Sequence, residues 1–389
     1  PNYARGQTVY VTDASRAVGV VASLISKETR ASVITDVRSE YARIIASHDT
    51  NRGPQRRLTL GQARANRFAP DWASYAPHAP QFIGVRNLDS YDLGELARYI
   101  DWLPFFQAWE MKGRFPDILD DPVAGPTARA LFADAQAMLK RIVEEKWLTA
   151  RASFGFWPAE SSGDDIVLYT DESRTKQLAI LHTLRQQVAR ERETPNLALS
   201  DFVAPAGAGK EDYAGAFVVT TGHGEEAIAA RFREDKDDYN AILLSALADR
   251  LAEAFAERLH ERVRKEFWGY APDEAFANAE LIAEAYRGIR PAPGYPAQPE
   301  HTEKGTIFRI LDAEKGAGVT LTESFAMWPG SSVSGLYIGH PDSRYFGVGK
   351  IERDQVEDYA RRKNWTLAEA ERWLGPILNY NPRKIIEAA

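Results

Sequence analysis

The chain has 389 residues, of which 44% are hydrophobic and 26% are charged, and this composition is typical of a folded globular protein. It contains no cysteine, which excludes disulfides, cysteine-ligated metal sites and a cysteine nucleophile, and which favours a cytoplasmic location. The formal charge of −7 and the lack of a long apolar stretch argue against nucleic acid and a membrane as partners.

The N-terminal stretch VYVTDASRAVGVVASLI, residues 9–25, predicts a buried strand, a turn at residues 13–16 and an apolar helix. A lone strand and helix cannot cover their own apolar faces, so such a βα unit normally belongs to a doubly wound parallel sheet. No second unit of this kind follows. We therefore interpret residues 1–30 as the last strand and helix of a domain whose earlier part is missing.

Residues 31–80 are expected to form a helix and then a linker. Prolines at 54, 70, 77 and 80 and the run Asn51-Arg52-Gly53-Pro54 are typical of linkers. Residues 81–389 contain no second break of comparable weight and are expected to form one large unit.

Helices and strands are mixed within this large unit. A helix is predicted at 126–145, and strands are predicted at 154–157, 166–169, 216–220, 306–311 and 335–338. The lack of a regular βαβα alternation favours an α+β fold, with a twisted antiparallel sheet and surrounding helices. The longest predicted helix covers residues 238–267, with an apolar stripe formed by Leu244, Leu247, Leu251, Phe255, Leu259 and Val263.

Four carboxylates recur every four residues on this long helix, namely Asp249, Glu253, Glu257 and Glu261. They share one helix face and repel one another, so a cation should compensate them. In one interpretation the interleaved arginines make this an ordinary solvated face. In the other, one or two of the acids face a pocket and bind a cationic ligand group.

The segment RGIRPAPGYPAQPEHTEK, residues 287–304, has four prolines that exclude a helix and predict a rigid, extended backbone with free polar groups. Arg290 could bind a carboxylate with two N–H groups, Gly294 permits close backbone approach, and Tyr295 offers a flat ring for stacking. The alternative is a simple proline-rich connector.

Further along, residues 328–332 and 340–343 predict tight turns, and the second is followed by the aromatic pair Tyr345 and Phe346. This pair is either part of the core or a stacking platform. No phosphate loop, metal-ligand spacing or Ser/His/Asp arrangement stands out, so neither a catalytic residue nor a metal site is expected in this chain.

Several long segments together closely resemble the activation domain of cobalamin-dependent methionine synthase. They are the proline-rich segment, the helix ADRLAEAFAERLHERVRKEFWGYAP (248–272) and LTESFAMWPGSSVSG (321–335), with shorter matches at 99–102, 201–205 and 354–363. The resemblance extends from about residue 81 to near the C-terminus. Residues 9–25 look like the last strand and helix of that family's cobalamin-binding domain.

The resemblance implies a reactivation module. In this family the activation domain presents S-adenosylmethionine as the methyl donor for reductive methylation of cob(II)alamin, and flavodoxin or a flavoprotein reductase supplies an electron. Cobalamin would be bound mainly by the missing upstream domain of the same polypeptide, and zinc only by absent modules. The parent is a methyltransferase, but this fragment alone would lack the complete active site.

The resemblance also assigns residues. Arg290, Gly294 and Tyr295 match the family's ligand motif. Arg290 would meet the ligand's carboxylate, and the backbone near Ala292 and Tyr295 would frame the adenine. Asp101, Glu253 and Glu284 would face the ammonium and sulfonium charges, and Tyr345 and Phe346 match a second contact segment. Ala14 and His301 match positions that approach cobalamin.

Two alternative functions belong to other classes. The first is a docking module that recruits a flavodoxin-like reductase and caps the cobalamin domain, and it predicts that Arg361, Arg362 and Lys363 control a salt-sensitive association. The second is a free-standing methyltransferase, which the absence of a glycine-rich loop disfavours.

Overall fold

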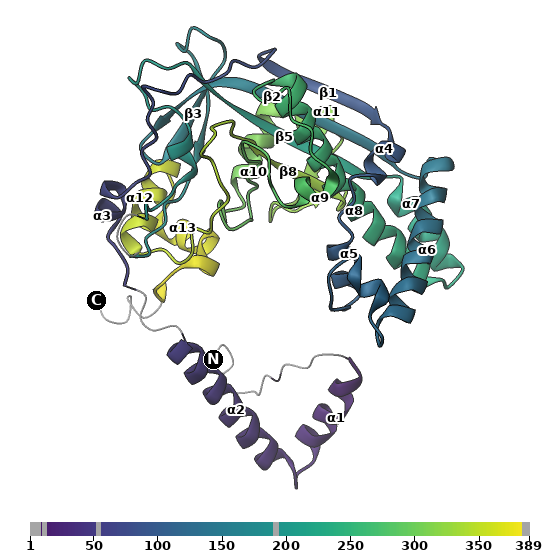
Figure 1. The fold of residues 1–389 in the computed structure, drawn as a ribbon. Helices are drawn as coiled ribbons and strands as arrows, with labels where there is room; N and C mark the ends of the chain where they lie inside the picture. Colours follow the sequence, from purple (N-terminus) through teal and green to yellow (C-terminus); the bar gives the residue numbers. More distant parts are fainter. Residues whose placement is uncertain (1–8, 10–13, 52–55, 190–193, 383–389) are drawn as a thin grey trace. The chain divides into compact units, whose positions relative to one another are not determined.

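The computed structural model describes residues 9, 14–51, 56–189 and 194–382. The chain divides into two compact units, Pro1–Arg57 and Leu58–Ala389 (Figure 1). None of the helices in the described part of the chain combines the length and the apolar character needed to cross a membrane.

The described part of the first unit consists of helices α1 (Ala14–Ile25) and α2 (Arg30–Asn51). The strand predicted ahead of α1 falls largely on residues 10–13, which lie outside the described residues. The turn predicted at 13–16 is wrong, because α1 already begins at Ala14. The segment 14–17, Ala-Ser-Arg-Ala, has no glycine or proline, and alanine and arginine are good helix formers.

The second unit begins within the predicted linker, at Leu58. Helix α3 (Leu60–Ala65) follows at once, with Thr59 and Gln62 forming a capping box and with Leu60 and Ala63 buried. A linker as far as residue 80 is therefore wrong, because local capping and two buried side chains outweigh the proline-rich composition of this stretch.

The second unit is built on a six-stranded antiparallel sheet with the order β4-β3-β2-β5-β8, and β1 also pairs with β2. Its strands are β1 (Gly84–Tyr91), β2 (Thr149–Ser162), β3 (Asp165–Tyr169), β4 (Gln177–His182), β5 (Asp212–His223) and β8 (Ser332–Tyr337). The short strands β6 (Thr320–Leu321) and β7 (Met327–Trp328) form a separate pair. The predicted strands at 154–157, 166–169, 216–220 and 335–338 fall on β2, β3, β5 and β8, and the last of these predictions runs one residue past the end of β8.

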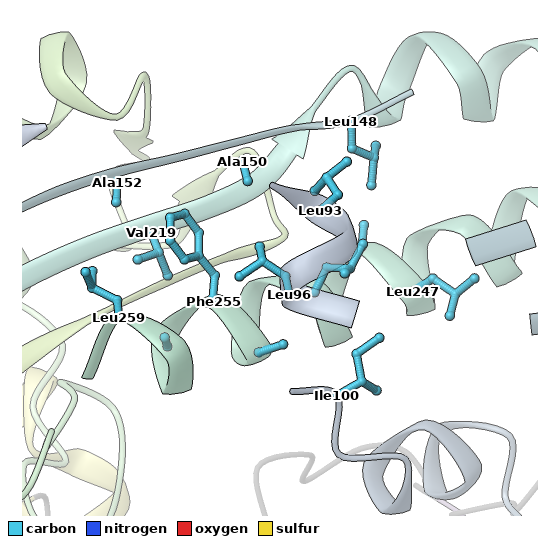
Figure 2. Close-up of a cluster of buried hydrophobic side chains, with 14 of the residues drawn as sticks. Leu93, Leu96, Ile100, Leu148, Ala150, Ala152, Val219, Leu247, Phe255 and Leu259 are labelled. Atoms are coloured by element: carbon cyan, nitrogen blue, oxygen red, sulfur yellow. The ribbon is translucent and has the colours of Figure 1, made fainter. Parts of the chain in front are cut away.

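Alternating side chains of the central strands enter different cores. In β2, Phe154 and Phe156 belong to one buried cluster, whereas Trp157 and Ala159 belong to another. Because successive side chains of a strand point to opposite faces, both faces of the sheet are covered. Figure 2 shows part of the first cluster, where residues of β2 and β5 meet α8 (Asp238–Arg262) and α4 (Leu93–Ala97).

The remaining elements complete these layers. They are α5 (Leu103–Ala108), α6 (Gly125–Glu144), α7 (Glu225–Glu234), α9 (Asn278–Ile282), α10 (Glu303–Leu311), α11 (Ala313–Gly316), the 3₁₀ turns Asp117–Asp120 and Leu199–Phe202, and a π-helical turn at Val263–Phe267. The predicted helix at 126–145 is α6. The predicted helix at 238–267 is α8 with the π-helical turn that continues it, and all six stripe residues are buried.

The strand predicted at 306–311 is wrong, because these residues belong to helix α10. Ile307, Ile310 and Leu311 are all buried in the second cluster. Their spacing of three and four residues fits one helix face, and this tertiary burial outweighs the β preference of isoleucine.

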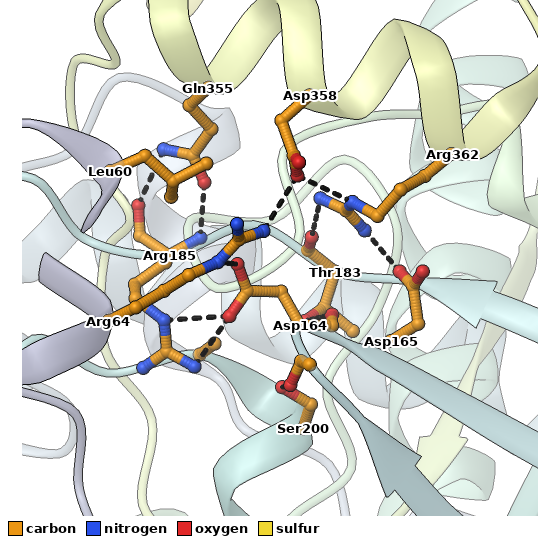
Figure 3. Close-up of polar contacts among 12 residues, drawn as sticks. Leu60, Arg64, Asp164, Asp165, Thr183, Arg185, Ser200, Gln355, Asp358 and Arg362 are labelled. Carbon is orange, nitrogen blue, oxygen red and sulfur yellow. Dashed lines mark hydrogen bonds and ion pairs between the residues drawn. The ribbon is translucent and has the colours of Figure 1, made fainter.

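A third, smaller core joins α12 (Arg353–Lys363), α13 (Leu367–Trp373) and the 3₁₀ turn Gly375–Ile377 to the end of the sheet. Beside it lies a network of ion pairs (Figure 3). Arg185 binds Asp164 and Asp201 at 2.7 Å, and Arg64 binds Asp164 and Asp358 at 2.8 and 2.7 Å.

Two of the three basic residues assigned to the docking alternative are part of the protein interior. The Arg362 side chain, 13% exposed, pairs with Asp165 and Asp358, and the Lys363 side chain, 9% exposed, pairs with Glu303 at 2.6 Å. Only the Arg361 side chain is largely exposed, at 74%. The run 361–363 is therefore not a basic docking surface.

Candidate functional site

Two pockets adjoin where α8 meets the proline-rich segment. They have volumes of about 470 and 370 Å³, and both are lined by Glu253, Glu284, Arg290 and Tyr295. We call the larger the apolar pocket and the smaller the acidic pocket. Because four lining residues are shared, one ligand can extend across both.

The apolar pocket has walls from several parts of the chain that are far apart in the sequence. Besides the shared residues it is lined by Phe217, Pro291, Ala292, Pro296, Ala297, Val333, Tyr345 and Phe346. Tyr295, 56% exposed, stands at the junction of the two pockets. Flat aromatic and apolar surfaces of this kind suit a heterocyclic ring.

The acidic pocket contains an excess of negative charge. Its lining residues include four carboxylates, from Asp101, Glu253, Glu257 and Glu284, and two guanidinium groups, from Arg250 and Arg290. The charge of Glu253 raises the pKa of the neighbouring Tyr295 hydroxyl. A ligand group with positive charge would be attracted here.

The Arg290 guanidinium is held by three side chains. Nη2 donates to Glu257 Oε2 at 2.6 Å, and Nη1 donates to the Tyr286 hydroxyl at 2.7 Å and to His260 Nδ1 at 3.3 Å. Although burial alone would lower it, the charge of Glu257 raises the pKa of Arg290 well above its ordinary value. Arg290 is therefore a fixed, permanently charged group.

The backbone of the proline-rich segment is less free than the sequence predicts. Ile289 exchanges two backbone hydrogen bonds with Ile338, and the Pro291 carbonyl accepts from the Leu336 N–H at 2.8 Å. The Arg290 N–H donates to the Tyr345 hydroxyl at 3.0 Å. The segment is thus tied to the end of β8, to Ile338 just beyond it and to the second predicted contact segment.

Gly294 permits a close approach, but in this structure the neighbour is a protein side chain. Its φ is +100°, and an added Cβ would lie 2.4 Å from Cε1 of His301. The exposed His301 in turn lies 3.0 Å from Lys304 through Nδ1 and Nζ. Burial and the Lys304 charge lower the pKa of His301, so the imidazole is neutral near pH 7.

Each acid of the α8 ladder has a different environment. Asp249 accepts from the Ser331 hydroxyl at 2.9 Å, and Glu261 pairs with Arg258 at 2.8 Å. Glu257 pairs with Arg290, whereas Glu253 lines both pockets. Asp249 and Glu261 thus have partners within the protein, whereas Glu253 and Glu257 face a pocket. Ligand binding by these acids stays a prediction.

The structure brings most of the predicted ligand residues together. Asp101, Glu253, Glu284, Arg290, Ala292, Tyr295, Tyr345 and Phe346 line one or both pockets, whereas Gly294 and His301 lie in and beside the adjacent turn and Ala14 lies in α1 of the other unit. Sequence reasoning missed Tyr286 and the role of Glu257. Tyr286 stands four residues before Arg290, and Glu257 stands one step beyond Glu253 on the ladder.

Comparison with known proteins decides the family. The model of the vitamin B12-dependent methionine synthase activation domain matches residues 92–364. The chain belongs to this family. A solved structure described as the MetH reactivation domain bound to AdoHcy is 54% identical, with a TM-score of 0.81, and the match covers 84% of this chain and 99% of that one. The resemblance drawn from the sequence and the predicted α+β fold are both confirmed, and the family implies a methyltransferase parent.

Proposed function

We propose that this activation domain binds S-adenosylmethionine across the two pockets and presents its methyl group for reactivation of methionine synthase. The observation that carries the proposal is the position of Arg290, which borders both an acidic pocket and an apolar one. The similarity to a reactivation domain solved with AdoHcy supports the same class of ligand.

Arg290 has the capacity to bind the ligand's carboxylate. A guanidinium carries five N–H groups, and the three contacts to Glu257, Tyr286 and His260 use three of them. The N–H on Nε and one on Nη2 are left without a partner among the described residues. Two neighbouring N–H groups are what a bidentate carboxylate requires.

The charge balance of the acidic pocket suits the rest of the ligand. S-adenosylmethionine carries an ammonium and a sulfonium as well as its carboxylate, so its net charge is positive. Four carboxylates against two guanidinium groups leave the pocket two negative charges in excess. We assign Asp101, Glu253 and Glu284 to these cations, and the apolar pocket around Ala292, Tyr295, Tyr345 and Phe346, next to the turn at Gly294, to the adenosine.

In reactivation, the work of this chain is to hold and orient the methyl donor. The cobalamin-binding domain of the parent would hold cobalamin, whose metal centre would be the nucleophile once flavodoxin or a flavoprotein reductase had provided an electron. His301 fits a contact with that group, because its ring is exposed, neutral and adjacent to the Tyr295 turn. Ala14, in α1, is the second position we assign to cobalamin.

Isothermal titration of S-adenosylmethionine into the full chain and into Arg290→Ala tests the proposal. We expect binding by the unaltered chain and a loss of at least about tenfold in the variant, because a charge-assisted carboxylate contact is removed. Arg309→Ala is the matched control, since Arg309 is an exposed arginine on α10 that lines neither pocket. Absence of binding by a chain that circular dichroism shows to be folded would refute the proposal.

A further inference from the structure

A buried polar layer holds the Arg290 guanidinium. It consists of Glu257 and His260 on α8 and Tyr286 on the loop after α9, and all three are buried. Their contacts to Arg290 measure 2.6, 3.3 and 2.7 Å. Three side chains thus hold one guanidinium, whereas an arginine that faces solvent can form its hydrogen bonds with water.

The protonation of this layer is consistent with its geometry. Burial and the charges of Arg264 and Arg290 lower the pKa of His260 well below its ordinary value, so the ring is neutral and Nδ1 accepts from Arg290. Burial raises the pKa of the Tyr286 hydroxyl far above its ordinary value, so this group stays protonated. Glu257 therefore supplies the only charge in the layer.

We propose that Glu257 is a positioning residue for ligand binding, which acts by fixing the Arg290 guanidinium with the help of Tyr286. This inference rests on the proposed function. A free arginine side chain loses considerable rotamer freedom when it binds, and a guanidinium already fixed has less to lose. The contacts of Glu257 and Tyr286 leave the Nε N–H and one Nη2 N–H for the ligand.

Glu257 also prevents an unproductive pairing. Glu253 and Glu284 line the same pockets as Arg290, and both are candidate partners for the ligand's cations. Without Glu257, Arg290 would be drawn to one of them by simple charge attraction. Arg290 would then no longer offer its free N–H groups to the ligand's carboxylate. The paired glutamate would no longer be available to the ligand's cations.

The experiment compares two ligands by isothermal titration, S-adenosylmethionine and its decarboxylated analogue. Only the first has the carboxylate that Arg290 binds. We expect Glu257→Ala to weaken S-adenosylmethionine about tenfold or more, and Tyr286→Phe about threefold, because charged hydrogen bonds contribute more than neutral ones. Binding of the decarboxylated analogue should change less than about twofold. Glu257→Gln, which keeps an acceptor oxygen, should restore part of the loss.

Controls separate this inference from the proposed function. Glu266→Ala removes a carboxylate that pairs with Arg262 and lines neither pocket, and it should leave both affinities unchanged. In the Arg290→Ala background, Glu257→Ala should cause no further loss.

Three results would overturn the inference. If folded Glu257→Ala and Tyr286→Phe bind S-adenosylmethionine with unchanged affinity, the positioning role of Glu257 is refuted and the proposed function is unaffected. Equal weakening of both ligands would make Glu257 a direct contact of the ligand's cations instead. No binding by the unaltered chain, with Arg290 intact, would remove both proposals. Thermal unfolding of each variant shows whether it is folded.

Discussion

At the scale of single residues, Arg290 shows how a binding group is prepared. Its backbone N–H donates to the Tyr345 hydroxyl, while its guanidinium is held by Glu257 and Tyr286. Two predicted contact segments, at 290–295 and 345–346, are thus joined by a direct hydrogen bond. The sequence predicted both segments, but the buried partners that hold Arg290 follow only from the three-dimensional arrangement.

A second residue, Asp212, makes stability depend on pH. Its carboxylate is 6% exposed and accepts from the Ala204 and Tyr213 N–H groups, both at 2.8 Å. Burial nevertheless raises its pKa from 3.8 to about 6. Because the folded state holds this proton more tightly than the unfolded state does, the contribution of Asp212 is complete below pH 3.8 and is lost as the pH rises through 6.

We therefore expect the Asp212 contribution to the free energy of unfolding to fall by about 2 kcal/mol between pH 4 and pH 7. Urea unfolding of the chain and of Asp212→Asn across this range measures it, since asparagine does not titrate. Burial lowers the pKa of His340 to about 4, so the contribution of His340 to the free energy of unfolding rises with pH. The relevant quantity is therefore the difference in the free energy of unfolding between the unaltered chain and Asp212→Asn. A constant difference across the range would contradict the prediction.

At the scale of elements, α8 performs two tasks with different faces. Its apolar stripe, which includes Leu247 and Phe255, packs in the first core (Figure 2), while Glu253 and Glu257 line the pockets. The helix therefore fixes the position of the acids relative to the sheet. Both faces could be predicted, because a helix repeats every 3.6 residues.

Leu247→Ala tests the structural task of α8. Leu247 is fully buried, so the substitution removes apolar contacts and leaves a cavity, and we expect a loss of about 2–5 kcal/mol in the free energy of unfolding. Ile242→Ala on the same helix is the control, because Ile242 is 58% exposed and should cost less than about 1 kcal/mol. Equal urea midpoints for the two variants would show that α8 does not anchor the core as described.

At the scale of the whole molecule, the ion-pair network of Figure 3 connects α3, the start of β3, the segment just after β4 and α12. The pairs of Arg362 in this network, together with the separate pair of Lys363 with Glu303, explain why residues 361–363 form no broad docking surface. Asp358 alone accepts from Arg64, Arg361 and Arg362. Segments nearly 300 residues apart in the sequence are thereby held together.

Neighbouring arginines of this network give a matched test. Arg362→Ala removes a nearly buried cation from Asp165, Asp358 and the Thr183 carbonyl, and we expect a loss of about 3 kcal/mol in the free energy of unfolding. Arg361→Ala removes a largely exposed cation and should cost less than about 1 kcal/mol. Urea unfolding of both variants measures the difference, and comparable losses would contradict the buried role of Arg362.

Much of the fold could be predicted from local pattern. The strands at 154–157 and 216–220 and the helices at 126–145 and 238–267 are recognisable because the periods of side-chain burial differ between strands and helices. Two of the errors, at 306–311 and in the linker before residue 80, occur where burial against distant parts of the chain decides the structure. Ile307 and Leu60 are buried by partners that local sequence does not reveal.

The sequence by itself determined the family, the mixed antiparallel fold and most residues that line the pockets, because long motifs and periodic patterns are local properties of the chain. Only the tertiary structure decided which acid of the α8 ladder pairs with Arg290, that Arg362 and Lys363 are internal, and that Gly294 packs on His301. The physical reason is that charge pairing and close packing depend on distances between segments remote in sequence, and no periodicity encodes those distances.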